Sequence, residues 1–213
     1  TVAAASSYLV GATYANGIFI ATGDGGVILT SADGTNWTGQ ISGVTNGLWG
    51  ATAGNGIFVA VGDKGTIVTS PDGIHWTEQT NGIADWFDSV AFNNGQFVAV
   101  GGNGAICASP DGTNWSREIS PVSDELWGVA GGKGQFVAVG DYGDIVTSPD
   151  GTNWMEQTSP ISESDLTLYN VSYGNGHFVA VGDSGTLLLS TDATNWIADD
   201  PGVDGELDAV TYY

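Results

Sequence analysis

Four aspartates recur at matching places along the chain, and regularly spaced carboxylates are the first groups here that could do chemistry. Each follows an apolar run that ends in glycine, and the set is Asp24, Asp63, Asp141 and Asp183, with Gly102 in the remaining place. In a symmetric fold they would form a ring that attracts cations, which makes them candidate metal ligands. A Gly-Asp-x-Gly hairpin turn explains the same pattern structurally. Both interpretations stay open.

A second set of candidates is aromatic. Trp49, Trp86, Trp127 and Tyr169 lie at or near the first strand expected in each segment. Aromatic rings there would pack between neighbouring sheets. An exposed subset could instead stack on sugar rings, which would make the protein a lectin.

Other catalytic groups are sparse. His75 and His177 lie at different places in different segments, so they do not predict a shared metal site. No serine, histidine and acid form a recognisable triad pattern. Acids for glycoside hydrolysis are plentiful, but none differs from its counterparts in the other segments. Cys107, the single cysteine, lies in an apolar run and is expected to be a buried thiol. We therefore expect no enzyme and no cofactor, with calcium as the alternative.

The charge of the chain limits its partners. The 213 residues carry 24 acids and 3 bases, for a net charge of −21. Nucleic-acid binding depends on lysine and arginine, so that class is excluded. No apolar stretch is long enough for membrane insertion. The expected partners are other copies of the chain, in a homo-oligomer or polymer, or a glycan.

An internal repeat organises the whole sequence. Phe19 and Trp37 recur together at spacings of 39, 39, 39 and 42 residues. The repeats cover approximately 7–43, 46–83, 85–122, 124–161 and 166–200, in a single domain that spans 1–213. Two independent markers with one period indicate five copies of one unit.

The fourth copy shows the layout of the unit. Strands are expected at 126–130, 135–139, 144–148 and 153–157, each bounded by Gly, Asp or Asn turns. The second strand is apolar on both faces, as in a sheet covered on both sides. Four antiparallel strands in about 40 residues, repeated five times, predict an all-β fold, a five-bladed β-propeller. A β-helix is the alternative.

The turn after the third strand carries a family resemblance. It reads Ser-x-Asp-Gly-x-x-Trp in four copies, as in Ser70–Trp76, while the fifth has Ala193 in place of glycine. This resembles the Asp-box of bacterial neuraminidase-type repeats, found in sialidase, sortilin and photosystem-assembly-factor propellers. The resemblance implies that the aspartate accepts hydrogen bonds from its own turn and that the tryptophan packs between blades. A calcium site at these turns is the alternative. Sialidases hold their substrate with several arginines, and Arg117 is the only one here.

Three N-glycosylation sequons start at Asn36, Asn114 and Asn170. The first residues, Thr1–Ser7, resemble the start of a processed protein, so we expect a secreted or cell-surface glycoprotein. Residues 7–14 and 206–213 both align with a first strand, and a closed ring has no place for both. One end could cover an edge, the chain could be part of a larger propeller, or a terminal strand could pair with another subunit.

These features predict a non-enzymatic extracellular protein with a structural or adhesive role, able to self-assemble through its surplus terminal strand. A glycan-binding lectin-like propeller is one alternative, and an assembly or scaffold factor for another complex is a second.

Overall fold

The computed structural model describes residues 8–161 and 166–212. Expectations that concern residues 1–7 and Tyr213 therefore fall outside the described residues. Within them the chain forms five sheets, each of four antiparallel strands in sequential order. This is the predicted five-bladed β-propeller.

The first three blades contain strands of similar length at equivalent places. Blade 1 comprises β1 (Leu9–Ala15), β2 (Ile18–Gly23), β3 (Val27–Ser31) and β4 (Thr38–Gln40). Blade 2 comprises β5 (Leu48–Gly54), β6 (Ile57–Gly62), β7 (Ile67–Ser70) and β8 (Thr77–Glu78). Blade 3 comprises β9 (Phe87–Asn93), β10 (Gln96–Gly101), β11 (Ala105–Ser109) and β12 (Ser116–Arg117).

The last two blades repeat the pattern. Blade 4 comprises β13 (Leu126–Gly132), β14 (Gln135–Gly140), β15 (Ile145–Ser148) and β16 (Met155–Glu156). Blade 5 comprises β17 (Leu168–Gly174), β18 (His177–Gly182), β19 (Leu187–Ser190) and β20 (Ile197–Asp199). The fourth strand is shorter than predicted. Five residues were expected in it, at 153–157, and β16 has two.

A three-residue 3-10 turn joins the second strand of each blade to the third. The five turns are η1 (Asp24–Gly26), η2 (Asp63–Gly65), η3 (Gly102–Gly104), η4 (Asp141–Gly143) and η5 (Asp183–Gly185). The recurring aspartates therefore begin tight turns. In η2, the backbone N–H of Thr66 donates to the Asp63 carbonyl at 3.0 Å and closes the turn.

The core lies between blades rather than within them. Val59 and Ile67 of blade 2 pack on Phe97 and Cys107 of blade 3 in one buried cluster. Ile20 of blade 1 packs on Phe58 of blade 2 in the equivalent place. Neighbouring residues of a strand point to opposite faces, so each inner blade is apolar on both sides. Burial raises the pKa of the Cys107 thiol to about 12. The reactive thiolate form is therefore disfavoured, in agreement with the buried thiol expected from the sequence.

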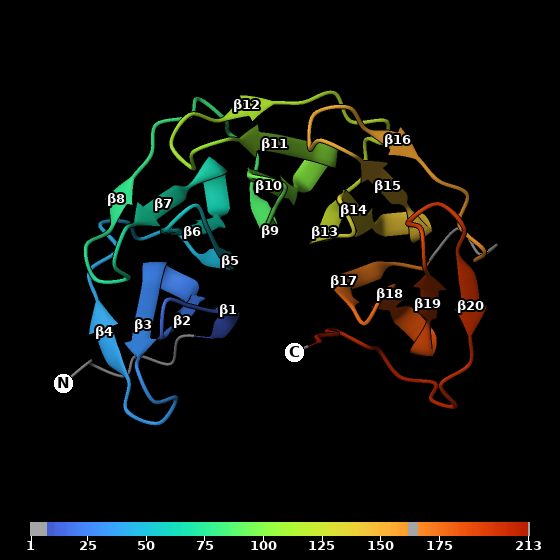
Figure 1. Cartoon of the computed structure of the whole chain (residues 1–213), viewed down its shortest axis with the longest axis horizontal. Helices are drawn as coiled ribbons and strands as arrows, with labels where there is room; N and C mark the ends of the chain where they lie inside the picture. The colour runs from blue at the N-terminus through green and yellow to red at the C-terminus, as the bar shows by residue number, and fades with distance from the viewer. Residues whose placement is uncertain (1–7, 162–165, 213) are drawn as a thin grey trace.

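The five blades form an arc that does not close (Figure 1). Each inner strand packs along the next, from β1 through β5, β9 and β13 to β17, and blades 1 and 5 lie at the two ends of the arc. Leu9 of blade 1 is 50% exposed, although its counterpart Leu48 is fully buried. In an open arc the two terminal segments do not compete for one place, so the conflict expected for a closed ring does not arise.

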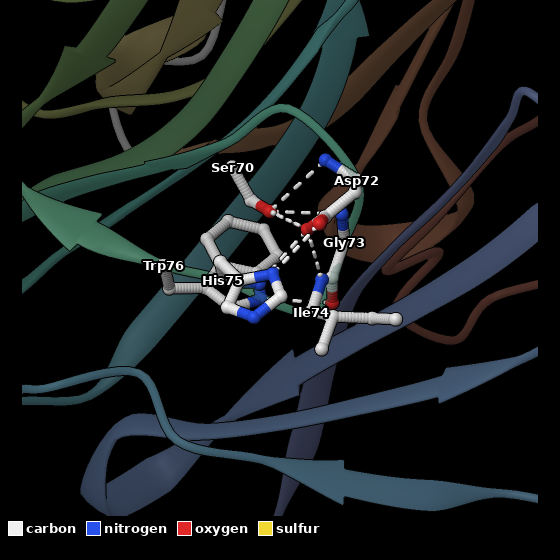
Figure 2. Close-up of polar contacts among 6 residues, drawn as sticks. All are labelled: Ser70, Asp72, Gly73, Ile74, His75 and Trp76. Carbon is white, nitrogen blue, oxygen red and sulfur yellow. Dashed lines mark hydrogen bonds and ion pairs between the residues drawn. The ribbon is translucent and has the colours of Figure 1, made fainter.

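The Ser-x-Asp-Gly-x-x-Trp turn locks the third strand to the fourth (Figure 2). The Asp72 carboxylate accepts hydrogen bonds from the backbone N–H groups of Ile74 and His75, both at 2.9 Å. The Trp76 indole donates to the Gly73 carbonyl at 2.9 Å. The hydrogen bonds that Asp72 accepts from His75 and Ile74 hold the pKa of its carboxyl well below the usual range. Equivalent bonds occur at Asp33, Asp111, Asp150 and Asp192.

The box also joins adjacent blades. A Cβ placed on Gly151, where φ is +80°, would lie 2.8 Å from Cγ2 of Val98 in the preceding blade. The fifth copy keeps the turn with Ala193, fully buried at a φ of 68°. Trp37 of blade 1 is 41% exposed, whereas Trp154 and Trp196 are buried. The box tryptophan is thus most exposed in blade 1 and is partly or fully buried in the four blades that follow another blade.

Replacing Gly151 with alanine should separate backbone strain from packing. Gly56→Ala is the matched control, because φ is +81° there and nothing lies within 4 Å of the added Cβ. We expect Gly56→Ala to cost about 1 kcal/mol and Gly151→Ala about 1 kcal/mol more, measured by urea unfolding. Equal losses would show that the box does not pack tightly on the preceding blade.

Candidate functional site

The five inner strands face the centre of the arc (Figure 1). Residues of these strands line a pocket. Its volume is about 770 Å³, and residues of β1, β5, β9, β13 and β17 line it together with Asp208 and Ala209. Pockets of roughly 300–1,000 Å³ are the size of small-molecule sites. Because every blade contributes one strand, the repeat itself builds this pocket.

Aromatic residues and aspartates meet in pairs around the pocket. In each pair an aromatic residue of the inner strand donates to the aspartate that begins the 3-10 turn of the same blade. The pairs are Trp49 Nε1 to Asp63 at 2.7 Å, Trp127 Nε1 to Asp141 at 2.9 Å, and Tyr169 OH to Asp183 at 2.7 Å. The structure thus brings together two sets that the sequence suggested separately.

Strand pairing explains why these residues meet 14 positions apart. The start of each inner strand pairs with the end of the second strand, as Leu48 does with Gly62. An aromatic residue just after that point therefore faces the aspartate just beyond it. The hydrogen bond from Tyr169 to Asp183 raises the pKa of the tyrosine to about 12. These carboxylates orient the aromatic walls of the pocket.

Blade 3 departs from this pattern. Phe87 pairs with Gly101 as Leu48 does with Gly62, so Asp88 takes the place of Trp49. Trp86 lies one residue before β9, does not line the pocket, and donates to Glu125 at 2.8 Å. Trp86 therefore lies apart from the other three aromatic residues, and its part in ligand binding stays a prediction. Its ring lies over Gly102, where a Cβ would approach it to 2.3 Å, which explains why glycine replaces aspartate there.

Asp88 is a pocket residue that the sequence analysis missed. Its Oδ2 atom is buried and has no hydrogen-bond partner among the described residues. Burial, and then the negative charge of Glu125, raise the pKa of Asp88 to about 8. In the sequence, Trp86 was aligned with Trp49, although Asp88 is the equivalent residue. Gly102, which stands where the other blades have aspartate, was the only sign of this difference.

The recurring aspartates do not gather into one cluster in the described part of the chain. No three acids, histidines or cysteines gather there closely enough to hold an ion. Asp63, Asp141 and Asp183 instead accept hydrogen bonds from aromatic side chains. In blade 1, the position equivalent to these aromatic residues is occupied by Val10. A calcium ion, at these turns or at the boxes, stays a prediction.

The sequon asparagines lie in two settings. Asn36 and Asn114 are exposed, and their side-chain amides donate to Asp33 and Asp111 at 2.7 Å. Asn170 lines the central pocket and accepts from the backbone of Val210. A glycan on Asn170 would fill the pocket, so Asn36 and Asn114 are the better candidates. Their use stays a prediction.

Asp88 should make stability fall with rising pH. Its pKa is raised in the folded state, so above about pH 4 the unfolded chain ionises first, and stability is lost between about pH 4 and 8. Asp88→Asn should flatten this loss and be more stable than wild type above pH 8, by at least about 1 kcal/mol. Urea unfolding from pH 4 to 9 measures it.

The exposed Asp204→Asn is the control for the general loss of a negative charge. If Asp88→Asn and Asp204→Asn had parallel pH profiles, the protonated state of Asp88 would be contradicted.

Comparisons with known proteins show the fold. No protein-family model matches the chain, and no curated protein matches it in sequence. YCF48 bound to D1 peptide is similar in structure, with a TM-score of 0.70, 20% identity, and coverage of 93% of this chain and 69% of that one. A catalytically inactive virginiamycin B lyase from Staphylococcus aureus, solved with quinupristin, gives a TM-score of 0.81, 12% identity, and coverage of 95% and 73%.

A nidogen/laminin complex gives a TM-score of 0.69 at 13% identity, covering 92% of this chain and 81% of that one. At these identities the likeness establishes the architecture alone, and membership of the Asp-box family stays a resemblance. The neighbours include one enzyme beside proteins solved with a peptide or a protein partner, so whether this chain is an enzyme stays a prediction. No described helix is long and apolar enough to cross a membrane. The chain is a β-propeller.

Proposed function

We propose that this chain is a non-enzymatic binding propeller, which holds an extended, positively charged segment of a partner protein in its central pocket. This corresponds to the assembly or scaffold alternative rather than to the adhesive polymer preferred from the sequence. The observation that carries the proposal is the pocket itself, with aromatic walls on several blades and only acidic charged groups.

The charge of the pocket favours a cationic segment. Asp208 lines it, and Asp63 and Asp141 lie behind its tryptophans. All three basic residues lie in the described part of the chain, and none lines the pocket. The net charge of −21 would further steer a basic partner toward the protein.

The aromatic walls favour lysine or arginine side chains. A cation over a tryptophan face gains about 0.5–2 kcal/mol. The indole of Trp127 is fixed by Asp141, and its ring lies 6.1 Å from that of Tyr169 in an edge-on arrangement. Two rings held in place lose little freedom when a ligand binds.

The comparisons support binding rather than catalysis. YCF48 was solved with a peptide, and nidogen with laminin. The lyase in the comparison is described as inactive when a histidine is replaced by alanine. Here His75 and His177 are both exposed and lie outside the pocket lining. The secreted or surface location, the polymer and the glycan partner receive no support from these neighbours and stay predictions.

Titration with a lysine–serine octapeptide tests the proposal. We expect binding that weakens with salt, and Trp127→Ala should reduce the affinity at least about tenfold, measured by calorimetry. Trp37→Ala is the matched control, because this tryptophan is exposed and belongs to a box outside the pocket.

Equal affinities of both variants would mean that the peptide binds the acidic surface, and would contradict the pocket. Binding of a glutamate–serine octapeptide would contradict the charge argument. A neutral oligosaccharide that binds in a Trp127-dependent manner, where the lysine peptide does not, would favour the lectin alternative.

A further inference from the structure

The segment at 206–212 lies where the inner strand of a sixth blade would lie. The backbone N–H of Val210 donates to Asn170 in blade 5 at 3.4 Å. The same bond joins blades 3 and 4, where the N–H of Val129 donates to Ser89 at 3.3 Å, also 40 residues earlier. The segment therefore has the register of an inner strand relative to the blade before it.

The position of a tyrosine ring gives the same register for residues 206–212. At the end of β17, a Cβ on Gly174 would lie 2.0 Å from the ring of Tyr212. At the end of β13, a Cβ on Gly132 would lie 2.1 Å from the ring of Tyr173, which belongs to the next inner strand. Tyr212 follows Tyr173 by 39 residues, the period of the repeat. Both marks thus give the same alignment.

The outer edge of this segment has no partner in the described part of the chain. Every other inner strand pairs with a second strand, as Val171 does with Ala180, but residues 206–212 pair with none. The face of blade 5 beside it is also open. Val179, Leu187 and Leu189 are partly exposed there, whereas their blade 4 counterparts Val137, Ile145 and Thr147 are buried.

We propose that this edge accepts the three outer strands of a sixth blade, supplied by a further segment with the sequence pattern of this repeat. The interface would continue the one formed four times between the five blades. Pairing would follow the register of blade 5, with a Phe-Val-Ala-Val-Gly strand opposite Leu207 to Tyr212. The occupant would also cover the apolar face at Val179 and Leu187.

A second intact copy of the chain does not fit this site. Its β1 would have to occupy the place that residues 206–212 already hold. The arc is open (Figure 1), and it superposes on longer chains, of which it covers 69% and 73%. Propellers of up to about eight blades are common. The open arc therefore suits additional blades rather than closure at five.

An extended chain tests the proposal. A copy of residues 175–200 is appended after Tyr213, so that the added strand follows Tyr212 as His177 follows Tyr173. We expect hydrogen exchange of the amides at 206–212 to slow at least about tenfold, and the melting temperature to rise by several degrees. The control extension has the same composition in scrambled order.

Two outcomes would overturn the proposal. One is unchanged exchange at 206–212, with the extension removed by protease as readily as its scrambled form. The other is protection of 206–212 in the unextended chain together with a dimeric mass in light scattering, because the occupant would then be a second copy.

Discussion

Blade-on-blade packing is the constraint on which the rest of the structure depends. A sheet of four short strands here is apolar on both faces, and Phe97, Val98 and Ala99 are all fully buried in one strand. Such a sheet cannot stand alone in water, so each blade depends on packing against its neighbours. The near-constant period of the repeat preserves this interface from one blade to the next.

The same constraint explains both the pocket and the open ends. Stacking the blades brings five inner strands to one axis, and the residue after the start of each strand then faces the centre. Trp49, Trp127 and Tyr169 line the pocket from there, each held by its own aspartate. Where the stacking stops, the interface residues Leu9 and Trp37 are left exposed.

Much of the fold could be predicted from the sequence because two markers repeat. Phe19 and Trp37 recur with one period, and each unit has four apolar runs separated by glycine-rich turns. The curvature of the array could not be predicted, because it depends on the packing angle between blades. The sequence therefore left open whether the five blades close into a ring, and the structure has an arc.

The site was predictable only in part. Aromatic residues and aspartates recur visibly, but their pairing requires the strand register that joins Leu48 to Gly62. In blade 3 a tryptophan two residues away from the expected place concealed Asp88. The elevated pKa of Asp88 comes from burial and from Glu125, and both depend on tertiary contacts. Sequence alone gives no sign of either.

The central claim is that a cationic segment binds between the aromatic walls of the pocket. Its most direct test is the indole N–H region of a nuclear magnetic resonance spectrum during titration with a lysine-bearing peptide. The account predicts that the indole signals of Trp49 and Trp127 shift, while those of the box tryptophans Trp76, Trp115 and Trp154, bonded to their own turns, stay in place. Shifts confined to the box tryptophans, or absent from Trp49 and Trp127 at saturation, would contradict it.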